Sequence, residues 1–320
     1  MSQTTSLIPF SESQFPALFV CEPKARRRVR DFFTAHIRNP HTRRAYRNAA
    51  VRFSTWCQAR GISELSRVET IHVSAYIEEF SQTHSRPTVK QHLAGIKMLF
   101  DWLVLGQVIP ANPAAIVRGP AHSQKKGKTP VLTAEETREL LDSMETDTLI
   151  GLRDRALIAL LVYSFSRVGA AVKMRVEDHY TQGRRGWVRL HEKGGKLHEM
   201  PAHHNLDSYL EEYIAAAGIA ADRKGLLFRT IRGRTGQLTR NPMLQQDVHR
   251  MIRQRAAAAG IRTRIGCHTF RATGITTYLK NGGKLEIAQL MAAHESSRTT
   301  GLYDRRGDEV SLDEVERIGI

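Results

Sequence analysis

The chain has 320 residues, which is more than one compact core usually contains, so we expect two domains. Its 48 lysines and arginines outnumber its 32 aspartates and glutamates, and the formal net charge is +16. So large a positive charge indicates a polyanionic partner, and it favours nucleic acid over a membrane surface or an acidic protein.

Several missing patterns narrow the class of protein further. The N-terminal residues show no signal-peptide pattern, and the longest apolar run, Ala156 to Tyr163, is far too short to span a bilayer. The three cysteines have no metal-binding spacing, and their odd number cannot pair completely. We therefore expect a cytoplasmic protein with no membrane partner, no structural metal and no other cofactor.

The first part of the chain is predicted to be a helical bundle. Residues 1–24 lack periodicity and are expected to be irregular, and helices follow over residues 25–112. The clearest helix covers 42–60, a second is predicted to open at a capping box at Ser66, and another has Pro87 in its first turn. The apolar stripe of the clearest helix consists of Ala45, Ala49, Phe53 and Trp56.

Basic side chains of this bundle are predicted to contact DNA phosphates. A solvated helix face is the usual meaning of such a row of charges, but phosphate contact is favoured in a chain this basic. The residues that we assign to this role are Arg43, Arg44, Arg47, Lys90 and Lys97.

A change of composition marks the expected boundary between the domains. Residues 113–130 are rich in proline, glycine and lysine and predict a linker before a second domain over 131–320. A capping box at Thr133 opens that domain. Short runs over 187–192 and 197–202, separated by a turn with two glycines, predict a β-hairpin. The fold class expected is mainly α with a small antiparallel β-sheet.

The most informative residues lie late in the sequence. His268 is followed three residues later by Arg271, and Tyr303 stands nine residues after His294. Each pair alone is common by chance, but their order and spacing together are not. The pattern resembles box II of the tyrosine recombinases, a family that includes the phage integrases and the Xer-type resolvases.

Two upstream motifs extend the resemblance. Residues Leu160 to Val172 look like the helix that delivers the family's first arginine, here Arg167, although Arg167 could instead pair with Asp178. The turn between the two strands is similar to the family's lysine-bearing β-turn, with Lys193 as the better match and Lys196 as the alternative. A charged turn can also be no more than a solvated hairpin tip. The resemblance implies two domains, a helical core-binding domain and a mixed α+β catalytic domain.

Transfer of a DNA backbone bond needs a nucleophile, cations at the transition state and a proton for the leaving oxygen. The sequence offers one candidate for each role. We assign the nucleophile to Tyr303, the proton acceptor to His268, the phosphate clamp to Arg167 and Arg271, the general acid to Lys193, and a supporting hydrogen bond to His294. The reaction would form a 3′-phosphotyrosyl link and free a 5′-hydroxyl, with neither ATP nor a metal.

Some positions depart from the family pattern. The family usually has an acidic residue three positions after its first arginine, whereas this chain has Ala170, so that the supporting carboxylate is either missing or supplied by Glu177 or Asp178. The usual Gly-Leu before that arginine is Phe165-Ser, and the usual Leu-Gly before the last histidine is Ala292-Ala. A DNA-binding accessory protein that has this fold but cleaves poorly is therefore the alternative, and a DNA-nicking topoisomerase is a third possibility.

Taken together, these patterns predict a site-specific DNA recombinase that serves DNA integration, excision or resolution, as in a mobile genetic element. Its partner would be double-stranded DNA, and the resemblance implies a homotetramer on synapsed sites. Residues 310–320 would form a C-terminal tail, with Ser311 to Ile320 as a short helix that docks into a neighbouring protomer. No metal site is predicted, because helical ligand spacing is missing among His191, His198, His203 and His204.

Overall fold

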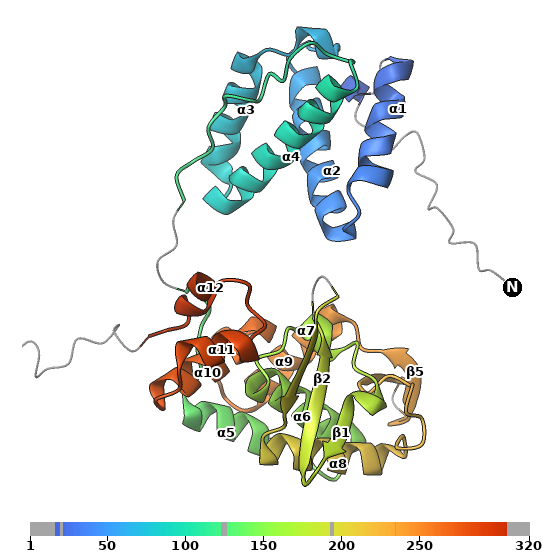
Figure 1. Cartoon of the computed structure of the whole chain (residues 1–320), viewed down its shortest axis with the longest axis vertical. Coiled ribbons are helices and arrows are strands. Elements are labelled where there is room, and N and C mark those ends of the chain that lie inside the picture. The colour runs from blue at the N-terminus through green and yellow to red at the C-terminus, as the bar shows by residue number, and fades with distance from the viewer. Residues whose placement is uncertain (1–16, 20–21, 123–126, 193–194, 234, 306–320) are drawn as a thin grey trace, which may run out of the picture. The chain divides into compact units, whose positions relative to one another are not determined.

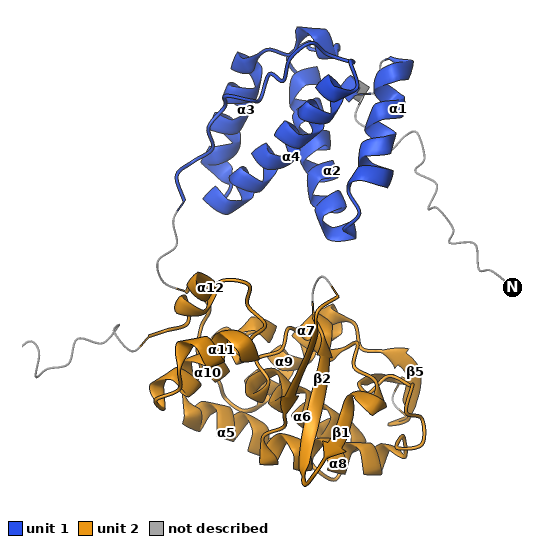
Figure 2. Cartoon of the chain, in the orientation of Figure 1, with its two compact units in different colours: residues 1–123 blue, residues 124–320 orange. Residues whose placement is uncertain are grey.

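The computed structural model describes residues 17–19, 22–122, 127–192, 195–233 and 235–305. The chain divides into two compact units, residues 1–123 and residues 124–320 (Figure 2). This division lies within the range 113–130 in which the linker was predicted. None of the helices in the described ranges has the length and apolar character that crossing a bilayer requires.

In its described residues, unit 1 is a bundle of four α-helices (Figure 1), with two short 3-10 segments and one π segment beside them. Helix α2 packs against α4, and the rings of Phe53 and Phe100 meet edge to face with centroids 6.0 Å apart. The elements are η2 (Ala17–Phe19), α1 (Pro23–Asp31), η3 (Phe32–His36), α2 (Pro40–Gln58), η4 (Leu65–Arg67), α3 (Thr70–Thr83) and α4 (Arg86–Leu105).

The helix starts of unit 1 follow local capping chemistry. Helix α2 begins at Pro40 because the side chain of Asn39 accepts hydrogen bonds from the next free backbone N–H groups. The prediction that Ser66 opens a helix is wrong. Helix α3 begins after Glu69, which forms a reciprocal capping box with His72, and the Ser66 hydroxyl donates to Glu64 instead. Helix α4 has proline in its first turn, as predicted.

Unit 2 combines helices with two small antiparallel sheets, so the predicted fold class is confirmed. Helix α6 is buried on every side and packs against α8 and α10. The helical elements are α5 (Ala134–Asp142), α6 (Leu149–Tyr163), α7 (Val168–Ala171), η5 (Val176–Asp178), α8 (His204–Ala217), α9 (Gln245–Ala258), α10 (Cys267–Lys280), α11 (Leu285–Met291) and α12 (Ser297–Gly301).

The sheets of unit 2 are short. The first has the order β1-β2-β3, with Trp187 opposite Pro201 and His191 opposite Leu197, so the predicted hairpin is present. Gly195 in its turn has φ +80°, a conformation that glycine adopts without strain. The second sheet, which the sequence did not predict, pairs β4 with β5. The strands are β1 (His179–Gln182), β2 (Arg185–His191), β3 (Leu197–Pro201), β4 (Arg229–Ile231) and β5 (Leu238–Pro242).

The helix predicted over Leu160 to Val172 is not continuous. Helix α6 ends at Tyr163, and Phe165 turns the chain with φ 52° before α7 begins. Gly274 on α10 faces this turn, where a Cβ atom would lie only 2.2 Å from the carbonyl oxygen of Val162. Glycine therefore permits the close approach of α10 to the turn, and α10 carries two of the predicted site residues.

Candidate active site

Arg271 on α10 lies at the centre of the site and holds two turns together. The residue is 1% exposed, and its guanidinium donates hydrogen bonds to the carbonyl oxygens of Phe165 and Ala292. Both turns contain a residue with positive φ, 52° at Phe165 and 47° at Ala293. The first turn leads into Arg167 and the second into His294. Arg271 therefore fixes the positions of both residues.

Arg167 stands at the N-cap of α7 rather than inside a helix. Its Nη1 atom lies 2.7 Å from Oε2 of Glu192, a carboxylate directly after β2 whose side chain is 3% exposed. The expectation that Glu177 or Asp178 would fill this role is wrong. Asp178 accepts a hydrogen bond from the backbone N–H of Arg175 at 2.8 Å and caps η5 instead. The Arg167 side chain is 34% exposed and can therefore meet a ligand.

The two arginines influence the protonation of the neighbouring groups. Burial, followed by the charge of Arg167, lowers the pKa of Arg271 to about 10, so that Arg271 stays charged at neutral pH. Burial and the charges of both arginines lower the pKa of His294 to about 4. His268 on α10 is more exposed, and partial desolvation and the same two charges lower its pKa. Both imidazoles are thus neutral at neutral pH, the form in which one ring nitrogen can accept a proton.

Tyr303 and His294 stack side by side, with ring centroids 5.9 Å apart and ring planes 7° from parallel. His294 is 8% exposed, and its Nδ1 atom lies 2.9 Å from the hydroxyl oxygen of Thr300 on α12. The carbonyl oxygen of Tyr303 accepts a hydrogen bond from Thr276 on α10 at 2.9 Å. The interaction with Tyr303 opposes the lowering of the pKa of Arg271, which places the tyrosine near the buried arginine.

The structure brings together five of the six predicted catalytic side chains, from α7, α10, the turn after α11 and the turn after α12. The sixth, Lys193, lies outside the described residues. Its alternative, Lys196, pairs with Glu295 on the exposed surface, Nζ to Oε1 3.2 Å. That contact brings the base of the β2–β3 turn next to the residue that follows His294.

The lowered pKa of His294 predicts a pH-dependent stability. The folded protein resists protonation of His294 until the pH is near 4, whereas the unfolded chain takes up the proton near pH 6.5. Stability is therefore complete above pH 6.5 and falls as the pH drops from 6.5 toward 4, by about 2 kcal/mol between pH 7 and pH 5. Urea unfolding at several pH values should show a smaller loss for His294→Gln than for the wild type. Equal losses of stability in the two proteins would mean that the pKa of His294 is not the cause.

The chain that enters unit 2 is bonded to the segment that carries Tyr303. The backbone N–H of Gly127 donates to the carbonyl oxygen of Leu302 at 2.9 Å, and a Cβ atom at Gly127 would lie 2.4 Å from that oxygen. From the other side, Arg305 donates to the carbonyl oxygen of Thr129 at 2.7 Å. The end of the predicted linker is thus hydrogen-bonded to the residues on either side of Tyr303, Leu302 before it and, two positions after it, Arg305.

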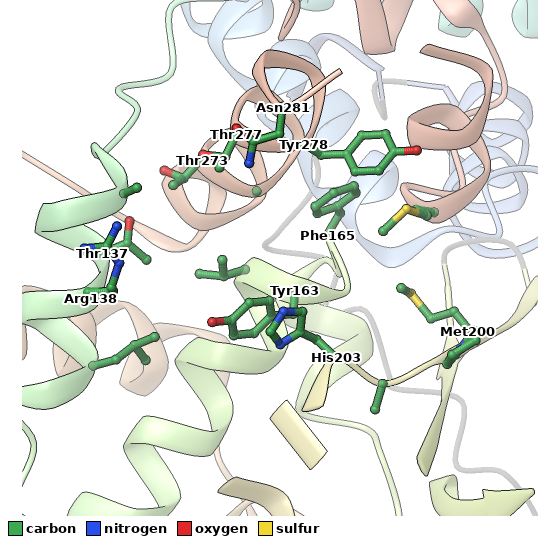
Figure 3. Close-up of a pocket in the computed structure, with 17 residues that line it drawn as sticks. Thr137, Arg138, Tyr163, Phe165, Met200, His203, Thr273, Thr277, Tyr278 and Asn281 are labelled. Carbon is green, nitrogen blue, oxygen red and sulfur yellow. The ribbon is translucent and has the colours of Figure 1, made fainter. Parts of the chain in front are cut away.

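A pocket of about 460 Å³ lies next to the site but does not belong to it (Figure 3). Phe165 and Met291 line it together with apolar parts of α5, α6 and α10, and His203 stacks on Tyr163 at its floor with centroids 4.2 Å apart. Of the predicted catalytic side chains that the structure describes, none lines this pocket. Its apolar walls are unsuited to a phosphate.

The structure places the predicted DNA-contact residues of unit 1 on α2 and α4. Arg44 and Lys90 are exposed. Arg43 donates to the carbonyl oxygen of Ile37 at 2.9 Å, and Lys97 donates to that of Ala115 at 3.0 Å, so both also stabilise local structure. Arg47 is half-buried on the same helix as Arg43. Their contact with DNA stays a prediction.

Reading the sequence missed two residues of the site. Glu192 gave no signal, because it stands at the end of a strand and far from Arg167 in the chain. Burial lowers the pKa of His198 on β3, and the charge of Glu192 opposes this lowering. The Nε2 atom of His198 is buried and has no hydrogen-bond partner among the described residues. The strand register, which sets His198 opposite Leu190 on the buried side of the hairpin, is the signal that could have found it.

Comparisons with known proteins agree with this geometry. Residues 130–309 match the phage integrase family, and residues 30–107 match the phage integrase N-terminal SAM-like domain. The chain is 28% identical over 270 residues to tyrosine recombinase XerD of Pseudomonas aeruginosa, an alignment that covers 82% of this chain and 86% of the relative.

Solved structures share the fold. The XerH site-specific recombinase in a post-cleavage complex with palindromic difH substrate has a TM-score of 0.69 at 17% identity, covering 95% of this chain and 90% of that one. A lambda integrase(75-356) dimer bound to a COC′ core site has a TM-score of 0.65 at 18% identity, covering 89% and 96%. With a family model that matches more than half of its length, the chain belongs to the phage integrase family and is a tyrosine recombinase.

Proposed function

We propose that this protein cleaves and rejoins double-stranded DNA at specific sites through a 3′-phosphotyrosyl intermediate on Tyr303. The observation that carries the proposal is the meeting of Tyr303 with a buried, charged Arg271 and a neutral His294. The net charge of +16 favours a polyanionic substrate, and the XerH and lambda integrase relatives are bound to DNA sites.

The two arginines are suited to hold the phosphate. A guanidinium has five N–H donors, and the protein carbonyls accept from only two nitrogens of Arg271, so donors are left for a non-bridging oxygen. Arg167 is held by one nitrogen and exposed on its other side. Together they would stabilise the charge that develops on the phosphorus-bound oxygens as the tyrosine attacks.

The reaction needs one proton removed and one proton delivered. The Tyr303 hydroxyl gives its proton to the neutral imidazole of His268, its oxygen bonds to phosphorus, and the bond to the 5′-oxygen breaks. Lys193 donates the proton that the 5′-oxygen takes up. His294 donates a hydrogen bond to a non-bridging oxygen from the ring nitrogen that does not face Thr300. Attack of another 5′-hydroxyl reverses these steps and rejoins the strand.

A hollow of about 710 Å³ adjoins His268 and would take the DNA backbone beside the scissile phosphate. Its wall includes Lys128, His249 and Arg264, all of which can meet phosphate oxygens. We propose that the basic residues of α2 and α4 contact the backbone elsewhere on the same DNA site.

The test is covalent capture. Overlapping duplexes that tile the DNA flanking the gene, each with a nick beside the candidate cleavage position, are incubated with the full chain and run on denaturing gels. The proposal expects a protein–DNA adduct and a free 5′-hydroxyl. Specific DNA binding to a duplex without any adduct would instead favour a DNA-binding accessory protein with the same fold.

We propose further that the protein acts as a homotetramer, with its C-terminal tail docked into a neighbour. Residues 310–320 lie outside the described residues, so the support is the family resemblance alone. Deleting them should leave DNA binding unchanged and reduce synapsis and strand exchange at least tenfold, because each protomer would lose one contact to the next. Binding is measured by gel shift and exchange by product analysis. Unchanged recombination by the truncated chain would contradict the role of the tail.

A further inference from the structure

Helix α7 brings no carboxylate to Arg167. The residue three positions after this arginine is Ala170, which is buried and whose backbone N–H donates to the carbonyl oxygen of Arg167 at 2.8 Å. A guanidinium on a long side chain has many rotamers, and an arginine that must hold a phosphate needs a partner to restrict them. That partner has to come from another element.

Glu192 is this partner, and it contacts Arg167 twice. Its Oε2 atom lies 2.7 Å from Nη1, and its Oε1 atom accepts from the backbone N–H of Arg167 at 3.5 Å. The Glu192 side chain is 3% exposed, while that of Arg167 is 34% exposed. The carboxylate is thus fixed inside the protein, and the guanidinium reaches from it toward solvent.

The charge of Glu192 also acts on the rest of the cluster. It opposes the lowering of the pKa of Arg271 and of His198. A buried carboxylate amid cations is stabilised by them and offsets part of their mutual repulsion. Removing its charge would leave Arg167 and Arg271 to repel each other at close range.

Glu192 has a second connection, through its backbone, to the β2–β3 turn. Its N–H donates to the carbonyl oxygen of Lys196 at 2.8 Å and closes the base of that turn. The next residue in the chain is Lys193, the proposed general acid. Glu192 is therefore bonded to Arg167 through its side chain and to Lys196 through its main chain.

We propose that Glu192 is a positioning residue for Arg167: it supplies, from the end of β2, the carboxylate that α7 lacks at position 170. The inference rests on the proposed DNA cleavage. It predicts that Glu192 acts on the rate of cleavage through Arg167 and leaves DNA affinity nearly unchanged, because many other cations contact the backbone.

The test is a double-mutant cycle on single-turnover adduct formation with the nicked duplexes. Glu192→Gln, which keeps the shape and removes the charge, should slow adduct formation roughly 10- to 100-fold with less than about a threefold change in DNA affinity. In an Arg167→Lys background the same substitution should change the rate less than about threefold, because its target is already altered. Glu192→Asp should recover part of the rate.

The matched control is Glu199→Gln on the same hairpin. Glu199 pairs with Arg189 at 2.7 Å on the exposed surface, so its variant should cleave like the wild type. The inference would be overturned if Glu192→Gln formed the adduct at the wild-type rate. It would also be overturned if the rate of the double variant equalled the product of the two single effects. If Glu192→Gln unfolds at the assay temperature, Glu192→Asp, whose shorter side chain weakens the contact with Arg167, takes its place in the cycle, with a smaller loss of rate expected in the wild-type background and none in the Arg167→Lys background.

Failure of the proposed function would look different from failure of this inference. If the wild type binds a duplex but forms no adduct with it, or if Tyr303→Phe still forms one, the cleavage mechanism itself is wrong. If wild type cleaves through Tyr303 and only the cycle shows no coupling, the role of Glu192 alone is overturned.

Discussion

Tyr303→Phe should form no covalent adduct with nicked DNA, while its affinity for the same duplex stays within about twofold of the wild type. The substitution removes the hydroxyl oxygen that we propose bonds to phosphorus and keeps the ring that stacks on His294. The loss should exceed about 10³-fold in single-turnover rate, the range expected when a covalent nucleophile is deleted. Denaturing gels measure the adduct, and gel shifts measure the affinity.

The matched control for this result is Tyr278→Phe. Tyr278 packs in the same small apolar cluster as Tyr303, against Phe165, with ring centroids 6.2 Å apart. Its variant should form the adduct at close to the wild-type rate. An adduct formed by Tyr303→Phe, or lost only in Tyr278→Phe, would assign the nucleophile to another residue.

Arg271→Lys should lose both activity and stability. Lysine has a single nitrogen and cannot donate to Phe165 and Ala292 together while also meeting a phosphate oxygen. We expect adduct formation to slow about 10²- to 10⁴-fold, as when a preorganised donor is removed from a transition state. At least one buried carbonyl would lose its partner, which should destabilise the fold by about 1–3 kcal/mol. Single-turnover cleavage and urea unfolding measure the two effects.

A variant of a second buried arginine, Arg229, separates the effect of Arg271→Lys on cleavage from its effect on stability. Arg229 is 6% exposed, donates to the carbonyl oxygen of Leu226 at 2.6 Å and pairs with Asp222, but it is not among the residues gathered around Arg271. Arg229→Lys should be destabilised to a similar degree and still form the adduct at low temperature. Equal losses of cleavage in both variants would mean that the effect of Arg271→Lys is one of folding alone.

Regular patterns in the sequence predicted most of the elements. The capping box at Thr133, the proline at the start of α4 and the pairing of β2 with β3 each have a local physical cause, and the structure shows each where it was expected. The helix start at Ser66 was wrong for an equally local reason: Glu69 and His72 form a competing box three residues later. Nearby residues alone cannot decide between two such starts.

The contacts of the site depend on tertiary structure and could not be predicted in the same way. The break between α6 and α7 is held by Arg271, which lies 106 residues from the carbonyl of Phe165 to which it donates. Glu192 lies 25 residues from Arg167 and was passed over in favour of Glu177 and Asp178, which are nearer in the chain. A carboxylate that pairs across two elements leaves no periodic signal in the sequence.

The hydrogen bonds of the Tyr303 segment link it to two distant parts of unit 2. Gly127 donates to Leu302 and Arg305 donates to Thr129, while Thr276 on α10 donates to the carbonyl oxygen of Tyr303. The position of Tyr303 is therefore set jointly by the first described residues of unit 2 and by α10, so a substitution at either place can displace the tyrosine without touching its ring.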